Sequence, residues 1–151
     1  MGEKHSDLIN KSRAAFLKWR ALPAPERGNY IRLFGEVLRE QKKEVANQIT
    51  SEAKKIISES EGEVQEVIDM CDFATGLSRQ LYGLTMPSER PNHRLQEIWQ
   101  PLGIVGCITA FNFPVAVFGW NFCLAAVCGN SIIWKPSPHS EGCADLSLIH
   151  I

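Results

Sequence analysis

The fold of this chain is decided by residues 102–135, which read LGIVGCITAFNFPVAVFGWNFCLAAVCGNSIIWK. A short apolar run at Leu102–Thr109 predicts a buried strand, Val115–Val127 predicts a helix, and Ser131–Lys135 predicts a second strand. The pair Gly129-Asn130 between them is typical of a helix end. A strand, a helix and another strand in about 30 residues form a βαβ unit, whose strands run parallel and are joined by a right-handed crossover.

The same stretch has to be tested as a membrane span, because residues 98–134 contain no charged side chain. Roughly 20 apolar residues are enough to cross a bilayer. Glycine, asparagine and proline residues, however, break this stretch into short pieces, and buried parallel strands with their covering helices are equally apolar. We therefore predict a buried βαβ unit and no membrane association. The interrupting residues are Gly103, Gly106, Asn112, Pro114, Gly119, Asn121, Gly129 and Asn130.

The first half of the chain is charged and has the apolar spacing of amphipathic helices. A first helix is predicted to end at Pro23, and a second to begin near Glu26 with a possible break at Thr50-Ser51. A third helix is predicted to close at Gly83, before a turn-rich connection. Weak alternation at Arg94–Gln100 suggests an exposed strand.

Composition excludes several classes of function. The 151 residues carry a net charge of -1, which gives no electrostatic reason to expect nucleic acid or an acidic membrane surface as a partner. The chain has an odd number of cysteines and no C-x-x-C motif, which fits a reducing cytoplasm. The N-terminus has no apolar segment of the kind that a secretory signal peptide needs, so we do not expect secretion. The four histidines lack metal-ligand spacing, so we expect no metal. These residues are Cys71, Cys107, Cys123, Cys128 and Cys143, and His5, His93, His139 and His150.

The point where the first strand ends and the helix begins is the strongest candidate site. It lies at the carboxyl edge of the predicted parallel strands, where open α/β sheets bind ligands. The helix N-terminus there favours negative charge, and the side-chain NH2 of Asn112 can donate to an oxyanion. The structural alternative is that Asn112 caps the helix, with Pro114 in its first turn.

Two other sets of charged residues have similar pairs of interpretations. Lys135 ends the second strand, where it could bind phosphate or ribose, although most lysines at strand ends are simply solvated. Four carboxylates lie at helical spacing in the third helix, and a solvated helix face is the expected arrangement for them. They are Glu63, Glu66, Asp69 and Asp72.

An ordered set of motifs resembles the aldehyde dehydrogenase superfamily. PLGIVG at 101–106 is followed by NFP at 112–114, then by a helix, and then by GN at 129–130 and KPS at 135–137. The form TAFNFPVAV at 109–117 is similar to the antiquitin branch, whose activities are on α-aminoadipate semialdehyde, also called piperideine-6-carboxylate in its cyclic form. The resemblance covers about residues 7–140.

The resemblance implies NAD-dependent oxidation of a small-molecule aldehyde to a carboxylate in the cytoplasm. By position, Asn112 matches the asparagine that stabilises the oxyanion of the thiohemiacetal, and Lys135 matches a lysine that contacts the adenosine ribose. Pro138 stands where many members have a ribose-binding glutamate. The remaining matches are Thr109, Ala110 and Phe111 in the segment lining the NAD pocket, and Pro136, Ser137 and Pro138 in the adjoining cofactor-binding turn.

The fold class implied is α/β: N-terminal helices plus the first βαβ unit of a Rossmann-like NAD-binding domain, incomplete. Residues 1–151 would form an N-terminal fragment that lacks the family's cysteine nucleophile and glutamate base and is inactive alone, whereas the full-length form would be a homo-oligomer. Residues 141–151 depart from the family and suggest a non-native tail. The alternative function is a non-enzymatic nucleotide-binding or subunit-interaction fragment.

Overall fold

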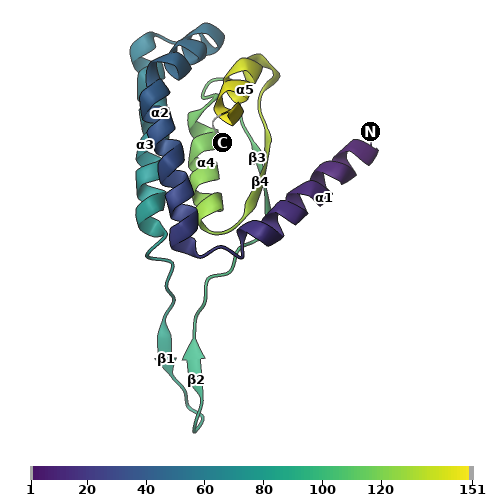
Figure 1. The fold of residues 1–151 in the computed structure, drawn as a ribbon, viewed down its shortest axis with the longest axis vertical. Helices are drawn as coiled ribbons and strands as arrows, with labels where there is room; N and C mark the ends of the chain where they lie inside the picture. Colours follow the sequence, from purple (N-terminus) through teal and green to yellow (C-terminus); the bar gives the residue numbers. More distant parts are fainter. Residues whose placement is uncertain (1, 150–151) are drawn as a thin grey trace.

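The computed structural model describes residues 2–149, which form helices and two small sheets (Figure 1). The helices are α1 (Gly2–Trp19), α2 (Ala24–Ala53), α3 (Ile57–Leu77), α4 (Ala116–Val127) and α5 (Glu141–Ile149), with a 3-10 turn, η1, at Pro138–Ser140. The strands are β1 (Thr85–Pro87), β2 (Arg94–Gln96), β3 (Ile104–Ile108) and β4 (Ser131–Lys135).

The predicted βαβ unit is confirmed. Strands β3 and β4 pair in parallel, from Ile104 opposite Ser131 to Ile108 opposite Lys135, and α4 connects them. The first strand is shorter than predicted, because Gly103 has a φ of 123° that does not continue a strand. Its N–H donates to the side-chain oxygen of Asn130 at 2.9 Å, so the residue that follows α4 also holds the start of β3.

The core lies where α2, α3 and α4 pack along one another, with the sheet on the other side of α4 (Figure 1). Helix α4 has no charged residue, but it is 12 residues long, and no helix within residues 2–149 is long and apolar enough to cross a membrane. The most deeply buried side chains come from all three helices. They include Ile31, Leu38, Val45 and Ile49 of α2, Val64, Val67, Ile68 and Cys71 of α3, and Cys123 and Val127 of α4.

Both ends of α4 are satisfied by side chains of the N-terminal helices. At its start, the Glu63 carboxylate of α3 accepts the N–H groups of Val115 at 2.8 Å and Ala116 at 3.1 Å. At its end, Arg27 Nε donates to the Val127 carbonyl at 3.0 Å, and burial lowers the pKa of Arg27 without removing its charge at neutral pH. A negative group at the helix start and a positive one at its end complement the helix dipole.

Two helix boundaries predicted from the sequence are wrong. Helix α2 continues past Thr50-Ser51 to Ala53 and ends where Lys54 adopts the left-handed conformation, with φ 58°. Helix α3 ends at Leu77 rather than Gly83, because the Ser78 hydroxyl turns back to donate to a carbonyl of the last turn at 2.6 Å. The connection that follows is not only turns.

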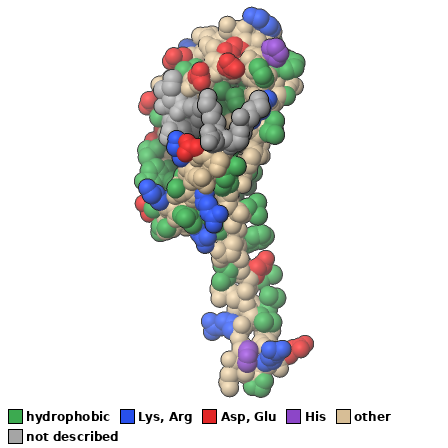
Figure 2. All heavy atoms as spheres, turned by 90° about the vertical axis from the view of Figure 1, so that its right-hand side faces the viewer, with side chains coloured by type: hydrophobic (Ala, Val, Ile, Leu, Met, Phe, Trp, Pro, Cys, Tyr) green, Lys and Arg blue, Asp and Glu red, His purple; other side chains and the backbone are tan. Residues whose placement is uncertain are grey.

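The connection contains β1, which pairs antiparallel with β2 and extends away from the helical body (Figures 1 and 2). We call residues 84–99 the arm. The arm confirms an exposed strand within Arg94–Gln100, but only Arg94–Gln96 is paired. Strands β1 and β2 each have three residues, and all of them are exposed. Because exposed strands need no alternation of apolar and polar residues, the sequence pattern does not reveal β1.

Residues 141–149, in the predicted tail, form α5, and residues 150 and 151 lie outside the described residues. The backbone N–H of Cys143 donates to the Glu52 carboxylate of α2 at 3.0 Å, and both Cys143 and Ala144 are buried. Burial alone would raise the pKa of Glu52, but hydrogen bonds from Cys143, Gln48 and Gly142 outweigh it and lower that pKa. That this segment is non-native stays a prediction.

Packing of α3 against α4 predicts a specific cost for one substitution. A Cβ added at Gly119 would lie 2.5 Å from a methyl group of Val67, whose branched side chain has little rotameric freedom. We expect Gly119→Ala to lower the free energy of unfolding by about 1–3 kcal/mol in urea titrations. The matched control is Gly62→Ala in α3, where nothing lies within 4 Å and helix propensity predicts a gain of about 1 kcal/mol. Equal effects of both substitutions would contradict the packing argument.

The lowered pKa of Glu52 predicts how stability depends on pH. A carboxylate whose pKa is lower in the folded state stabilises the fold above the ordinary value near 4.5, and that contribution is lost as pH falls through the folded value. We expect Glu52→Gln to flatten the acid limb of a plot of unfolding free energy against pH. Superimposable acid limbs for the parent and the variant would show that the contact with α5 does not hold this carboxylate in its charged form.

Candidate active site

The structure brings the predicted site residues together at one edge of the β3–β4 sheet. Because Ile108 and Lys135 are opposite each other, both strands end at the same level. The Thr109 N–H donates to the Lys135 carbonyl at 3.2 Å, which extends the pairing by one bond. The two segments that follow, 109–112 and 136–138, therefore start side by side at the carboxyl edge, where open α/β sheets bind ligands.

Thr109 is fixed by the core rather than open to a ligand. It is 5% exposed, and its hydroxyl accepts a hydrogen bond from the Trp134 indole N–H at 2.9 Å. The Trp134 ring in turn stacks on Phe118 of α4, with centroids 3.8 Å apart. Thr109 thus anchors the loop that starts at it, because its hydroxyl and its backbone N–H are both engaged in hydrogen bonds.

Ala110, Phe111, Asn112 and Phe113 are the exposed part of that loop. Phe111 is 57% exposed, and its ring meets His139 edge-on at 6.3 Å, so the segments after β3 and β4 are in contact. Within the described part of the chain, no hydrogen bond engages the Asn112 side chain. Its NH2 group is therefore available to a ligand at the edge.

The alternative in which Asn112 caps the helix is wrong. Helix α4 begins at Ala116, and its N-cap residue is Val115, which has no side-chain oxygen. The N–H groups that a cap would satisfy donate to Glu63 instead. A residue far away in the sequence has taken the capping role, so Asn112 lies in the loop before the helix.

The segment after β4 combines an exposed cation with a buried turn. Lys135 is exposed and forms no ion pair with any of residues 6–146, whose side chains the structure describes. Ser137 is buried, and its hydroxyl accepts the His139 N–H at 3.2 Å, which starts η1. Pro136 is half-buried and Pro138 exposed. Lys135 is therefore the side chain of this segment best placed to meet a ligand.

Glu63 was predicted to be on a solvated helix face, which is wrong. Its side chain is 0% exposed and forms an ion pair with Lys55, Nζ to Oε2, at 2.6 Å. The signal was present in the sequence: Ser60, Glu63, Val67 and Cys71 follow helical spacing along the buried stripe of α3. A carboxylate within a buried stripe requires a partner.

A small cavity of about 470 Å³ lies beside Asn112. Its wall is formed by the end of the α2–α3 linker, the first turns of α3, and the loop before α4. The lining residues are Lys55, Glu59, Gly62, Glu63, Glu66, Asn112 and Phe113. Asn112 therefore lies between this charged cavity and the sheet edge.

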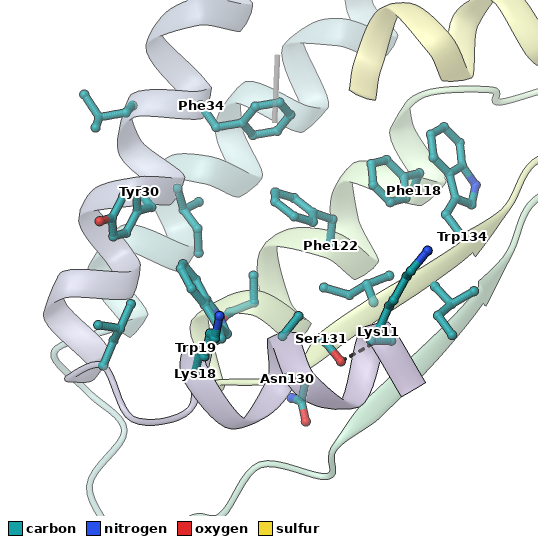
Figure 3. Close-up of a pocket in the computed structure, with 18 of the residues that line it drawn as sticks. Lys11, Lys18, Trp19, Tyr30, Phe34, Phe118, Phe122, Asn130, Ser131 and Trp134 are labelled. Carbon is teal, nitrogen blue, oxygen red and sulfur yellow. Dashed lines mark hydrogen bonds between the residues drawn. The ribbon is translucent and has the colours of Figure 1, made fainter. Parts of the chain in front are cut away.

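A larger apolar groove of about 1030 Å³ lies elsewhere, between α1, α2, α4 and β4 (Figure 3). Aromatic rings dominate the groove, with Lys11 and Lys18 of α1 along it, and the hydroxyls of Ser12 and Ser131 are 3.0 Å apart. None of the predicted site residues lines it, so it is not the candidate site. The rings are Trp19, Tyr30, Phe34, Phe118, Phe122 and Trp134.

Four of the five cysteines are in environments that suppress nucleophilicity. Burial raises the pKa of Cys107, Cys128 and Cys143. For Cys123, a hydrogen bond with Cys71, with sulfur atoms 3.6 Å apart, raises the pKa together with burial. Thiols with raised pKa values are protonated at neutral pH and react poorly.

Comparison with known proteins agrees with this architecture. "Aldehyde dehydrogenase family 7 member A1" of Malus domestica is 53% identical over 136 residues, 90% of this chain and 27% of that protein. The α-aminoadipic semialdehyde dehydrogenase of Rattus norvegicus is 50% identical over 134 residues, 89% of this chain and 25% of that protein. The crystal structure of an NADP-dependent enzyme of Escherichia coli superposes with a TM-score of 0.87 at 27% identity, covering 94% of this chain and 30% of that one.

The chain thus spans about a quarter of the length of these curated relatives. The resemblance to the antiquitin branch is confirmed, since relatives of that type are 48–58% identical to this chain. Residues 2–151 match the aldehyde dehydrogenase family as a whole. This match includes the N-terminal helices, the βαβ unit and the sheet-edge loop, and the chain therefore belongs to the aldehyde dehydrogenase family.

Proposed function

We propose that this chain supplies the oxyanion-stabilising asparagine and part of the cofactor site of an NAD-dependent aldehyde dehydrogenase. The observation that carries the proposal is the state of Asn112, which lies exposed at the carboxyl edge of β3 and β4 and is not used as a helix cap. An exposed amide donor at a sheet edge is suited to a charge that develops on a substrate oxygen.

The proposed chemistry assigns each exposed group one task. When a cysteine thiolate from the rest of the enzyme adds to the aldehyde, the carbonyl oxygen becomes an oxyanion, and the Asn112 NH2 donates to it. Lys135 would hold the ribose of a nicotinamide cofactor from the neighbouring strand end, while Ala110 and Phe111 would line its pocket. The cofactor would supply the hydride acceptor. An exposed cation without an ion-pair partner among the described side chains of residues 6–146 fits a polar cofactor group.

The proposed substrate is an aldehyde of the α-aminoadipate semialdehyde type, and the proposed product is the carboxylate. Support comes from the rat relative, which is an α-aminoadipic semialdehyde dehydrogenase and is 50% identical to this chain. We propose NAD as cofactor and the cytoplasm as location. The neighbour from Escherichia coli is NADP-dependent, so the choice of cofactor has to be measured.

We further propose that the 151-residue chain alone does not oxidise aldehydes. The raised pKa values of Cys107, Cys123, Cys128 and Cys143 disfavour each of them as the nucleophile. Cys71 is 0% exposed and therefore out of reach of a substrate. Activity then requires a cysteine and a general base from the remaining length that relatives have. Aldehyde-dependent formation of NADH by the purified chain would contradict this proposal.

A hybrid enzyme tests the role of Asn112. In it, the chain replaces the matching quarter of the rat enzyme, and α-aminoadipic semialdehyde and NAD are the substrates. We expect Asn112→Ala to lower kcat by about 10²–10³-fold, because the oxyanion loses a donor that acts only in the transition state. The measurement is steady-state NADH formation.

The matched control is Asn121→Ala on α4. Asn121 is exposed and its side chain donates only to a carbonyl of its own helix, at 2.7 Å, so its removal should leave kcat within about twofold. Comparable losses in both variants, or no loss in Asn112→Ala, would reject the assignment of Asn112. Comparing NAD with NADP in the same hybrid determines the cofactor.

We also propose that the full-length form is a homo-oligomer and that the arm is part of its assembly surface. The arm extends away from the body, and its large apolar side chains are open to solvent (Figure 2). Met86 and Leu95 are opposite each other across β1 and β2 and are 43% and 48% exposed. Such a projecting apolar hairpin has unpaired edges that another chain can cover. This feature also supports the alternative of a subunit-interaction fragment without catalysis.

Replacing both Met86 and Leu95 with serine is expected to weaken self-association of the hybrid enzyme by about tenfold or more in Kd. Sedimentation over a range of concentrations measures this. The exposed Glu89→Gln at the tip of the arm serves as control, with an unchanged Kd expected. If the double variant assembles as tightly as the parent, another surface forms the interface.

A further inference from the structure

The buried ion pair between Lys55 and Glu63 lies directly beneath the loop that carries Asn112. Lys55 is in the short linker between α2 and α3, and Glu63 is in the second turn of α3. Their side chains are 15% and 0% exposed, and Nζ and Oε2 are 2.6 Å apart. An ionised carboxylate as deeply buried as Glu63 is unfavourable unless it has partners, and the mostly covered Lys55 ammonium is one of them.

The second oxygen of Glu63 holds the C-terminal side of the Asn112 loop. Oε1 accepts the N–H of Val115 at 2.8 Å and the N–H of Ala116 at 3.1 Å. Charge-assisted bonds from a carboxylate to backbone N–H groups are stronger than neutral ones. They fix where α4 starts and therefore the point from which the loop runs back toward β3.

Lys55 holds the same loop at a second point. Its Nζ lies 3.5 Å from the centre of the Phe113 ring, a cation–π contact with the residue next to Asn112. Lys55 therefore contacts the loop at the Phe113 ring, and Glu63 binds it at the backbone N–H groups of Val115 and Ala116. Asn112 itself is outside both contacts, and with Lys55, Glu63 and Phe113 it borders the small cavity.

We propose that Lys55 and Glu63 are positioning residues that hold the Asn112 side chain at the sheet edge in its donating geometry. This inference rests on the proposed function, in which that side chain binds an oxyanion. An oxyanion donor is effective only if it is oriented before the charge develops, since otherwise the site has to reorganise during the reaction. Neither residue contacts the reacting atoms in this proposal; both act through the loop 111–116.

The first test uses the full 151-residue chain and reads the loop directly by NMR. In Lys55→Met and Glu63→Gln, we expect the N–H groups of Val115 and Ala116 to exchange with solvent about 10- to 100-fold faster. The side-chain NH2 signals of Asn112 should shift, while exchange in the core of α3 stays unchanged. Lys55→Arg keeps the charge and the ring contact and should restore most of the protection.

The control for loss of an ion pair is Asp72→Asn, which removes the exposed pair between Arg39 and Asp72. It should leave the loop and Asn112 unaffected. Unchanged exchange in Lys55→Met and Glu63→Gln would overturn the proposal. A uniform rise of exchange throughout the chain would overturn it as well, because it would show a general stabilising role instead of local positioning.

The second test uses the hybrid enzyme and separates positioning from the proposed function. We expect Lys55→Met and Glu63→Gln to lower kcat by about 10- to 100-fold with KM for the aldehyde nearly unchanged, and Lys55→Arg to recover most of kcat. A normal kcat per folded molecule in Lys55→Met would overturn the positioning role. If instead Asn112→Ala has no effect on kcat, the proposed function fails, while the NMR result still decides whether the pair fixes the loop.

Discussion

Helix α4 has no charged side chain of its own, yet it is held at both ends by buried charges from other helices. The Glu63 carboxylate accepts its first N–H groups, and the Arg27 guanidinium donates to one of its last carbonyls. The signs match the helix dipole, and hydrocarbon packing against α2 and α3 fills the space between. Because α4 joins β3 to β4, these two contacts also determine where the strands of the sheet lie, and hence the edge where they end.

The candidate site follows from the same arrangement. Since Glu63 supplies the acceptor at the start of α4, Asn112 is released from the capping role that its position in the sequence suggests. Thr109 fixes the other end of the loop through Trp134 and the Lys135 carbonyl. Between these two anchors, the exposed residues are Ala110, Phe111, Asn112 and Phe113. Buried residues such as Thr109 and Glu63 hold the loop in place, and the candidates for chemistry are the residues exposed at the carboxyl edge of β3 and β4.

The sequence predicts most of the βαβ unit, because apolar runs and the Gly129-Asn130 helix end are local signals. It also predicts the residues of the sheet edge, since parallel strands place their carboxyl ends together. It fails where the decisive partner is distant: Glu63 is 52 residues from Val115, and nothing near Asn112 shows that its cap has been replaced. Strand β1 is missed because three exposed residues have no apolar alternation, and the end of α2 is misplaced because Lys54 in the left-handed conformation has no glycine to mark it.

The span of these contacts along the chain also orders the events of folding. Helices α2 and α3 are close in sequence and can form a hairpin early, when Arg27 and Glu63 have no helix to bind. The bond from Arg27 to Val127 closes a loop of 100 residues, so it forms only after residue 127 has been synthesised. Until then the side chains of Arg27 and Glu63 lie on a face of the hairpin that α4 does not yet cover. Water covers that face, and when α4 packs against it, backbone groups of the helix replace water as the hydrogen-bond partners of Glu63 and Arg27.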